Sequence, residues 1–388
     1  MKRKEWVDLS NKFSDREREL LIRSYDTITT NIYEKDEYLW SPYRCITPGK
    51  VSFDGIWNWD SAFHAIGVSR WDTSLARDSI SGFLKFQKKN GLLPDVVRES
   101  GNIVDTFSKP PLFPWAVETI YKRETDTEFL KSVYPKLVLN EAFWVKERCY
   151  EGLFFYDAEN RDTDDYLIRV KYESGWDNSP RWDKGITEYW AIDLNCFMVM
   201  FYRSMSFLAK ELCLATDAAT WNTKAETLGK AINEKMWDSE NQYYSDTNKF
   251  TEEVSSILSP ASFMPLYIGI APCDRAKSMC HIAEERFKSK MPTVPFDSAE
   301  YSNNYWRGPT WLNVAYFAAK GLKNYGFEVA DSIKESILEM CYSEKRGIYE
   351  NYDSLTGEGL GCDHFSWSCV FINEFILNFE KEIPPCLN

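Results

Sequence analysis

The 388-residue sequence lacks the features that address a protein to a membrane or to nucleic acid. No apolar run approaches the roughly 20 residues that a membrane-spanning helix needs. The N-terminal stretch MKRKEWVDLSNKF is basic but has no apolar segment like that of a signal peptide. Basic charge is scarce, because 46 Lys and Arg stand against 59 Asp and Glu, a formal net charge of −13. Nucleic acids and anionic membranes are bound through basic surfaces, so we expect neither as a partner.

Motifs for metals and nucleophiles are also missing. The ten Cys are scattered singly without a CxxC pair, which predicts neither a disulfide framework nor a zinc site. We therefore expect reduced thiols in a cytoplasmic protein that needs no metal or cofactor. There is no GxSxG elbow and no GxxxxGK[ST] phosphate loop. The three His (His64, His281 and His364) leave little room for a histidine-based mechanism, and His64, in SAFHAIGV, is interpreted as a core residue.

Aromatic residues, by contrast, are abundant. There are 15 Trp, 22 Tyr and 24 Phe, which together make up 16% of the chain. Large aromatic side chains fill hydrophobic cores, and their faces also cover the apolar faces of sugar rings. No linker rich in Gly, Ser or Pro divides the sequence, so we expect one domain over residues 1–388.

The apolar periodicity is helical along most of the chain. Some segments have one apolar stripe, such as 217–237 with Trp221, Ala225, Leu228 and Ile232, while others, such as 191–209, are apolar on all sides. The two kinds alternate over twelve expected helices, near residues 15–33, 60–71, 73–90, 112–123, 126–149, 189–213, 217–236, 260–268, 272–285, 306–322, 325–342 and 364–380. This alternation predicts an all-α fold, an (α/α)6 barrel in which the loops before six inner helices line one cleft.

Carboxylates and indoles gather in YESGWDNSPRWDKG, residues 172–185, a segment that suits neither helix nor strand. Glycoside hydrolysis needs two carboxyl groups, one that protonates the leaving oxygen and one that acts on the opposite face. The acid needs a pKa raised by burial or by a neighbouring charge. Asp177 follows Trp176 and is the preferred candidate, with Glu173 and Asp183 as rivals in the same segment.

The second carboxylate should come from another loop at the same end of the barrel. GIYENYDSLTGEGLG, residues 347–361, offers Glu350, Asp353 and Glu358. Glu350 follows an apolar pair that suits a short strand, and Glu358 lies between glycines. The residues alone do not decide between these candidates.

Five sequence blocks, FDGIWNWDSAFHA, SKPPLFPW, ESGWDNSPRWD, NNYWRGPTW and YENYDSLTGEGLG followed by FSW, carry a resemblance. Their order and spacing resemble glycoside hydrolase family 63, above all its compact bacterial branch of mannosylglycerate and glucosylglycerate hydrolases, with trehalases more distant. The resemblance implies an (α/α)6 barrel and an inverting reaction, with Asp177 as general acid and Glu350 as general base. It implies that Trp57, Trp59 and Asp60 hold the sugar and that Tyr305, Trp306 and Trp311 are further walls, and we count Trp176 among these binding residues.

Two positions depart from the family pattern. Lys109 and His364 stand where relatives usually carry Gln, and both are expected to contact the substrate. These departures either are sequence drift at positions behind the substrate contacts or indicate an altered substrate, with an anionic group near Lys109. A cation close to Asp177 would also lower the pKa of this carboxyl group, which counts against a general acid.

The leading hypothesis is an inverting α-glycosidase that hydrolyses a small α-glucoside or α-mannoside, either glycerate-bearing or a disaccharide. The extra β-sandwich of larger family members is absent from this sequence, which favours a small substrate. A sugar isomerase or epimerase is disfavoured because such enzymes work through histidines. A non-catalytic or altered-specificity sugar-binding protein on the same barrel is the alternative. The sequence predicts no oligomeric state.

Overall fold

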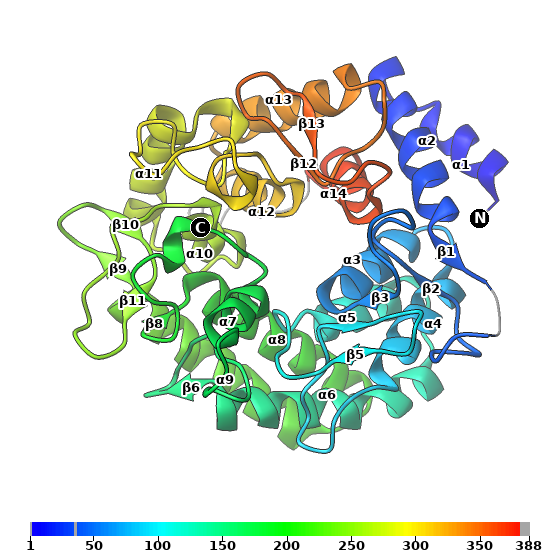
Figure 1. Cartoon of the computed structure of the whole chain (residues 1–388), viewed down its shortest axis with the longest axis horizontal. Coiled ribbons are helices and arrows are strands. Elements are labelled where there is room, and N and C mark those ends of the chain that lie inside the picture. The colour runs from blue at the N-terminus through cyan, green and yellow to red at the C-terminus, as the bar shows by residue number, and fades with distance from the viewer. Residues whose placement is uncertain (1, 35–36, 381–388) are drawn as a thin grey trace.

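The computed structural model describes residues 2–34 and 37–380, which form a ring of helices with short antiparallel strands at its rim (Figure 1). The helices are α1 (Arg3–Ser10), α2 (Asp15–Thr30), α3 (Asn58–Val68), α4 (Thr73–Leu84), α5 (Phe113–Arg123), α6 (Thr127–Glu147), α7 (Tyr166–Ser174), α8 (Ile192–Glu211), α9 (Ala215–Lys235), α10 (Met264–Tyr267), α11 (Cys273–Ile282), α12 (Leu312–Asn324), α13 (Val329–Ser343) and α14 (Ser366–Leu377). The strands are β1 (Ile32–Tyr33), β2 (Cys45–Ile46), β3 (Ile56–Trp57), β4 (Val96–Val97), β5 (Ile103–Val104), β6 (Cys149–Tyr150), β7 (Leu153–Phe154), β8 (Tyr189–Trp190), β9 (Trp237–Asp238), β10 (Tyr243–Tyr244), β11 (Thr247–Asn248), β12 (Asn351–Tyr352) and β13 (Gly359–Leu360).

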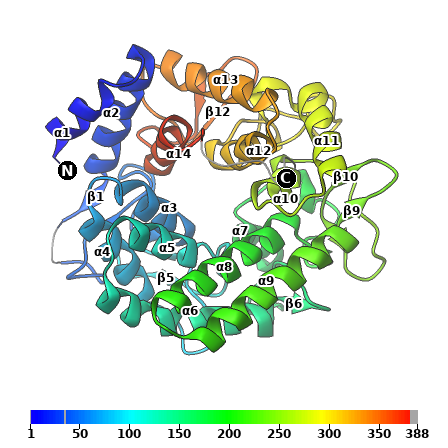
Figure 2. The ribbon, with the colours of Figure 1, turned by 180° about the vertical axis from the view of Figure 1, so that it is seen from behind.

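Six helices make the inner ring. Going round it, α3 packs against α5, α5 against α8, α8 against α10, α10 against α12, α12 against α14, and α14 against α3, so the ring is closed. Figures 1 and 2 show α2, α4, α6, α9, α11 and α13 outside these helices, seen from the two ends of the barrel. The predicted (α/α)6 barrel is confirmed.

Burial explains why the two kinds of helix could be told apart in the sequence. Every residue of α3 is buried, and α14 buries all but its last residue. The outer helix α9 buries one stripe, which contains the predicted Trp221, Ala225, Leu228 and Ile232. An inner helix meets neighbours on all sides, whereas an outer helix meets the barrel on one side and solvent on the other.

Several element boundaries differ from the prediction. Helix α12 begins at Leu312 instead of 306, because Tyr305–Arg307 form a 3₁₀ turn and Gly308 and Pro309 separate it from the helix. The expected helix at 260–268 is a 3₁₀ turn, Pro260–Phe263, followed by the short α10. Helices α1 and α7 were not predicted. The interpretation of residues 172–185 as wholly non-helical is wrong, because α7 extends to Ser174 and Pro180–Trp182 form a 3₁₀ turn.

The expectation of reduced thiols is wrong at Cys273, which is disulfide-bonded. Among the residues that the structure describes, the cysteines with free thiols are Cys45, Cys149, Cys196, Cys213, Cys280, Cys341, Cys362 and Cys369. Within residues 2–34 and 37–380, no three His, Cys, Asp or Glu side chains group in a way that would hold a metal ion. No helix in this part of the chain has the length and apolar character needed to span a bilayer.

Candidate active site

A pocket of about 80 Å³ lies where the segments that begin the inner helices meet. Trp59 and Asp60 belong to the first turn of α3, Trp311 is the N-cap residue of α12, and Trp367 belongs to the first turn of α14. The predicted site residues that line this pocket are Trp57, Trp59, Asp60, Lys109, Asp177, Tyr305, Trp306, Trp311 and Glu350. Phe53, Gly175, Phe365 and Trp367 also line it and were not singled out, although all four belong to the aromatic motif blocks.

Two predicted site residues lie outside the lining. Trp176 is 1% exposed and stands behind the pocket wall, with its ring centroid 4.8 Å from that of Trp306. The His364 imidazole lies outside the lining with a side chain 58% exposed, beside the carboxylate of Asp363. The part of His364 that is engaged is its carbonyl, which accepts a hydrogen bond from Asn31 Nδ2 at 2.8 Å.

The structure separates Asp177 from its two rivals. Glu173 is fully buried and is held by Arg148 Nε at 2.9 Å and by the backbone N–H of Ser108 at 3.1 Å. Asp183 has a side chain 47% exposed and pairs with Arg307 Nη2 at 2.8 Å. Both therefore have structural partners outside the pocket, and Asp177 is the carboxyl group of this segment that faces it.

Burial raises the pKa of Asp177 to about 6, although the Lys109 ammonium acts to lower it. The cation near Asp177 was an argument against a general acid. Burial outweighs that cation, so the carboxyl group keeps its proton at a higher pH than an exposed aspartate does.

Glu350 directly precedes β12, which pairs with β13, and its carboxyl group lines the same pocket as Asp177. Its side chain accepts a hydrogen bond from Tyr305 Oη at 2.8 Å and one from the backbone N–H of Cys362 at 3.2 Å. Burial raises the pKa of Glu350, while these two donors act in the opposite direction by stabilising the carboxylate. Gly361 adopts φ 72°, and a Cβ atom there would lie 2.5 Å from Glu350 Oε2, so only glycine fits against this carboxylate.

The other candidates of the same hairpin lie elsewhere. Asp353 accepts hydrogen bonds from the backbone N–H groups of Leu355 and Thr356 and so shapes the turn. Glu358 has a side chain 60% exposed and lies 3.3 Å from Arg346. Of the three carboxylates, Glu350 is the one that lines the pocket.

The walls of the pocket are stacked aromatic rings. Trp306 and Trp311 stack with centroids 3.8 Å apart and planes 12° apart, and Trp311 Nε1 donates to the carbonyl of Tyr305 at 3.0 Å. The rings of Trp59 and Trp367 form a neighbouring pair, with their centroids 5.5 Å apart. Burial raises the pKa of Asp60, at the base of this wall, to about 7, with Lys109 acting to lower it. Apolar ring faces next to buried carboxyl groups suit a ligand with both C–H faces and hydroxyl groups.

A buried ion cluster fixes the segment that carries Asp177. The Arg181 guanidinium donates two hydrogen bonds each to Asp193 and Asp246, at 2.8–3.0 Å. It also lies 4.7 Å from the Trp176 ring centroid and 4.4 Å from that of Trp182. Arg181 therefore holds the residues on both sides of Asp177 against the start of α8.

Arg181→Met is expected to lower the free energy of unfolding by roughly 3–5 kcal/mol, because it leaves two buried carboxylates without their cation. Urea denaturation followed by tryptophan fluorescence measures this loss. The matched control is Arg3→Met, which removes an arginine from the exposed Arg3–Asp26 pair and should leave the free energy of unfolding close to that of the wild type. Equal losses in the two variants would contradict the structural role of Arg181.

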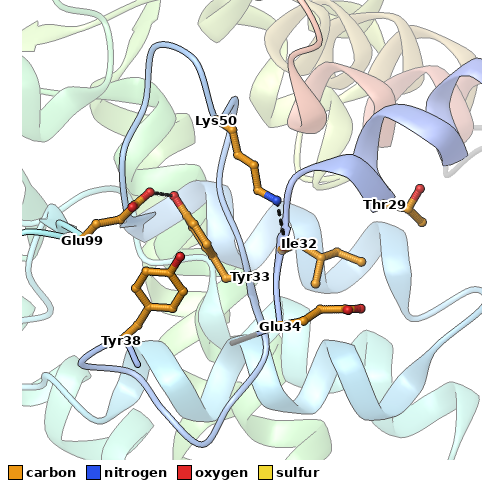
Figure 3. Close-up of a pocket in the computed structure, with 7 residues that line it drawn as sticks. All are labelled: Thr29, Ile32, Tyr33, Glu34, Tyr38, Lys50 and Glu99. Atoms are coloured by element: carbon orange, nitrogen blue, oxygen red, sulfur yellow. Dashed lines mark hydrogen bonds between the residues drawn. The ribbon is translucent and has the colours of Figure 1, made fainter. Parts of the chain in front are cut away.

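A larger cavity of about 600 Å³ lies at the rim, between the end of α2 and the turn that joins β4 to β5 (Figure 3). Tyr33 Oη donates to Glu99 and accepts from the backbone N–H of Gly55 at 3.1 Å, and Lys50 Nζ donates to the Ile32 carbonyl at 2.9 Å. The carboxylates in its wall, Glu34 and Glu99, are exposed. This cavity lacks a pair of buried carboxyl groups, so the candidate site is the smaller aromatic pocket.

Comparisons with known proteins show which proteins this chain is similar to. A family model described as "Mannosylglycerate hydrolase MGH1-like glycoside hydrolase domain" matches residues 54–368. The mannosylglycerate hydrolase of Rubrobacter radiotolerans is 25% identical over 425 residues, covering 85% of this chain and 92% of its own. A periplasmic trehalase of Escherichia coli is 25% identical over 401 residues, covering 88% and 69%. The crystal structure of a GH63 mannosylglycerate hydrolase from Thermus thermophilus with Tris and D-glycerate superposes with a TM-score of 0.76 at 23% identity, covering 91% and 98%.

Proposed function

This chain belongs to the family of MGH1-like glycoside hydrolases, and from that premise we propose that it is an inverting α-glycosidase of a small α-glucoside or α-mannoside. Membership makes the chain a glycoside hydrolase that acts on small glycosides. The relatives named above are mannosylglycerate hydrolases and a trehalase. Glycerate-bearing α-mannosides and α-glucosides, together with trehalose, are therefore the first substrates to test.

The observation that carries the proposal is that two buried carboxyl groups, 173 positions apart in the sequence (350 − 177), line one aromatic pocket. Burial raises the pKa of both carboxyl groups. At Glu350 the hydrogen bonds from Tyr305 and from the backbone N–H of Cys362 act against this rise and stabilise the carboxylate, which suits the role of a base.

In the proposed reaction, Asp177 protonates the glycosidic oxygen as the bond to the anomeric carbon breaks. Glu350 takes a proton from a water molecule, which attacks that carbon from the opposite face. The new hydroxyl group then has the configuration opposite to that of the broken bond. The stacked indoles would cover the ring faces of the sugar, and Asp60 in its ionised form would accept hydrogen bonds from hydroxyl groups.

The first-formed anomer tests the proposal. Proton NMR of fresh reaction mixtures with an α-linked substrate should show the β-anomer first, followed by slower mutarotation to the equilibrium mixture. A first-formed α-anomer would exclude inversion. If none of the glycerate-bearing glycosides, trehalose or simple α-glycosides is hydrolysed, the assigned substrate class is wrong.

A further inference from the structure

Lys109 lies in the loop before α5 and lines the aromatic pocket, which we call the reaction pocket. Its side chain contacts residues of three other segments. Its ammonium donates to the carbonyl of Tyr172 in α7 and lies 3.5 Å from Asp95 Oδ1. Lys109 Nζ is also 5.9 Å from the ring centroid of Trp59 in α3. The side chains of Lys109 and Asp95 are only 9% and 8% exposed, so this is an enclosed pair.

Acidic groups outnumber this cation. Among the described residues that line the pocket, Lys109 is the only cation, and Asp60, Asp177 and Glu350 are the acids. Burial acts to lower the pKa of Lys109, but Asp95, Asp177 and Asp60 outweigh it and raise the pKa above its usual value. The ammonium is thus already matched by carboxyl groups of the protein. An anionic substrate group would meet more negative than positive charge here, which favours a role for Lys109 other than anion binding.

We propose that Lys109 is a positioning residue that sets the charge of the reaction pocket: it fixes which buried carboxyl groups are ionised, and so fixes the pH range in which hydrolysis runs. The proposal rests on the function proposed above, since it assumes that Asp177 is the general acid. It assigns the charge of this side chain to the protein's own carboxyl groups and not to the substrate.

The neighbours of each group give the physical basis. The charges of Lys109 and Asp95 act on Asp177. The charge of Asp177 in turn helps to raise the pKa values of Glu350 and Tyr305. Asp60 faces Lys109, Asp95 and Glu350. Without the ammonium, burial and the mutual repulsion of these carboxylates would act unopposed. The pKa values of Asp177 and Asp60 would both rise, so Asp177 would become a weaker acid and Asp60 would lose its charge as an acceptor.

Asp95 should have the opposite effect. It faces Lys109 and Arg98 as cations and Glu173 as an anion, and its own negative charge helps to raise the pKa of Asp177. An uncharged side chain at this position would leave the Lys109 ammonium uncompensated next to Asp177. The pKa of Asp177 would then fall. Opposite shifts from the two members of one ion pair are the signature of a charge effect.

The test compares the pH dependence of kcat/KM for the wild type, Lys109→Gln, Lys109→Arg and Asp95→Asn, with α-mannosylglycerate or trehalose, whichever the wild type hydrolyses. Activity requires the protonated Asp177, so the wild-type profile should fall as the pH rises through about 6. The descending limb should move up by about one pH unit in Lys109→Gln, move down by a similar amount in Asp95→Asn, and stay in place in Lys109→Arg. A Lys109→Gln variant with a raised KM and an unmoved limb would show direct substrate binding and overturn the inference.

A second readout is independent of turnover. ¹³C NMR of protein labelled at the Asp carboxyl carbons gives the titration of Asp177, whose signal the Asp177→Asn variant identifies. The same opposite shifts are expected in Lys109→Gln and Asp95→Asn, and shifts of equal sign or none would contradict the inference. If Lys109→Gln does not fold, the downward shift in Asp95→Asn decides the question alone. A wild type that hydrolyses none of the substrates would refute the proposed function, while the NMR titration would still judge the charge effect.

Discussion

Asp177→Asn is expected to reduce kcat by a factor of about 10²–10⁴ on an α-glycoside with an alcohol leaving group. The amide has the shape of the carboxyl group but holds no acidic proton, so the leaving oxygen departs as an alkoxide. Below about pH 6, where burial keeps the Asp177 carboxyl group protonated, the substitution exchanges one neutral polar group for another, so we expect the fold to stay intact. Steady-state kinetics and thermal unfolding measure the two quantities.

The leaving group separates this role from a binding role. An α-glycosyl fluoride releases fluoride, which needs little protonation, so Asp177→Asn should keep most of its activity on the fluoride. The matched control is Asp183→Asn in the same segment, whose side chain is 47% exposed and paired with Arg307. It should stay within a few-fold of the wild type on both substrates. Equal losses on glycoside and fluoride in Asp177→Asn would assign Asp177 to binding.

Glu350→Gln is expected to reduce kcat by a similar factor of about 10²–10⁴, and on both kinds of substrate. A water molecule must lose a proton to attack the anomeric carbon whatever the leaving group is, so the fluoride should not restore activity. The glutamine can keep the hydrogen bond from Tyr305, which is 2.8 Å from Glu350 Oε1, and this protects the pocket geometry. The two variants should therefore differ in their response to the fluoride.

Glu358→Gln is the control for this second variant. Glu358 belongs to the same hairpin, but its side chain is 60% exposed and faces Arg346. Its kinetic constants should match those of the wild type. If Glu358→Gln lost as much activity as Glu350→Gln, the base would lie at the hairpin tip and not in the pocket.

Much of the fold could be predicted because inner and outer helices differ in burial, and this difference is visible in how apolar residues are spaced along the sequence. Helix α14 is apolar on nearly all sides, whereas α9 shows its stripe of Trp221, Ala225, Leu228 and Ile232. Helix α7 could not be predicted in this way. It lies at the rim with Leu167 and Ile168 more than half exposed, so its sequence has no clean apolar face.

For the candidate site, the sequence predicted which loops meet but not which side chains pair within them. Motif blocks indicated which segments meet, and the pocket contains most of the residues that they supplied. The choice between Glu350, Asp353 and Glu358 depends on the direction of side chains in a hairpin, which composition does not encode. The ion pair of Lys109 could not be predicted either, because its partner Asp95 belongs to no motif block. Nor could the position of the His364 imidazole, which lies outside the lining.

Closure of the inner ring has a consequence for the order in which the protein matures. Helix α14 packs against both α2 and α3. The segment leading to it supplies Glu350 and Phe365 to the pocket, and its own first turn supplies Trp367. During synthesis the first half of the chain, including Trp59 and Asp60, leaves the ribosome well before these residues. A nascent chain that stops short of residue 350 can assemble only part of the pocket lining and lacks Glu350, the proposed base. We therefore expect hydrolysis to begin only once the last inner helix has docked, and truncated translation products to be inert.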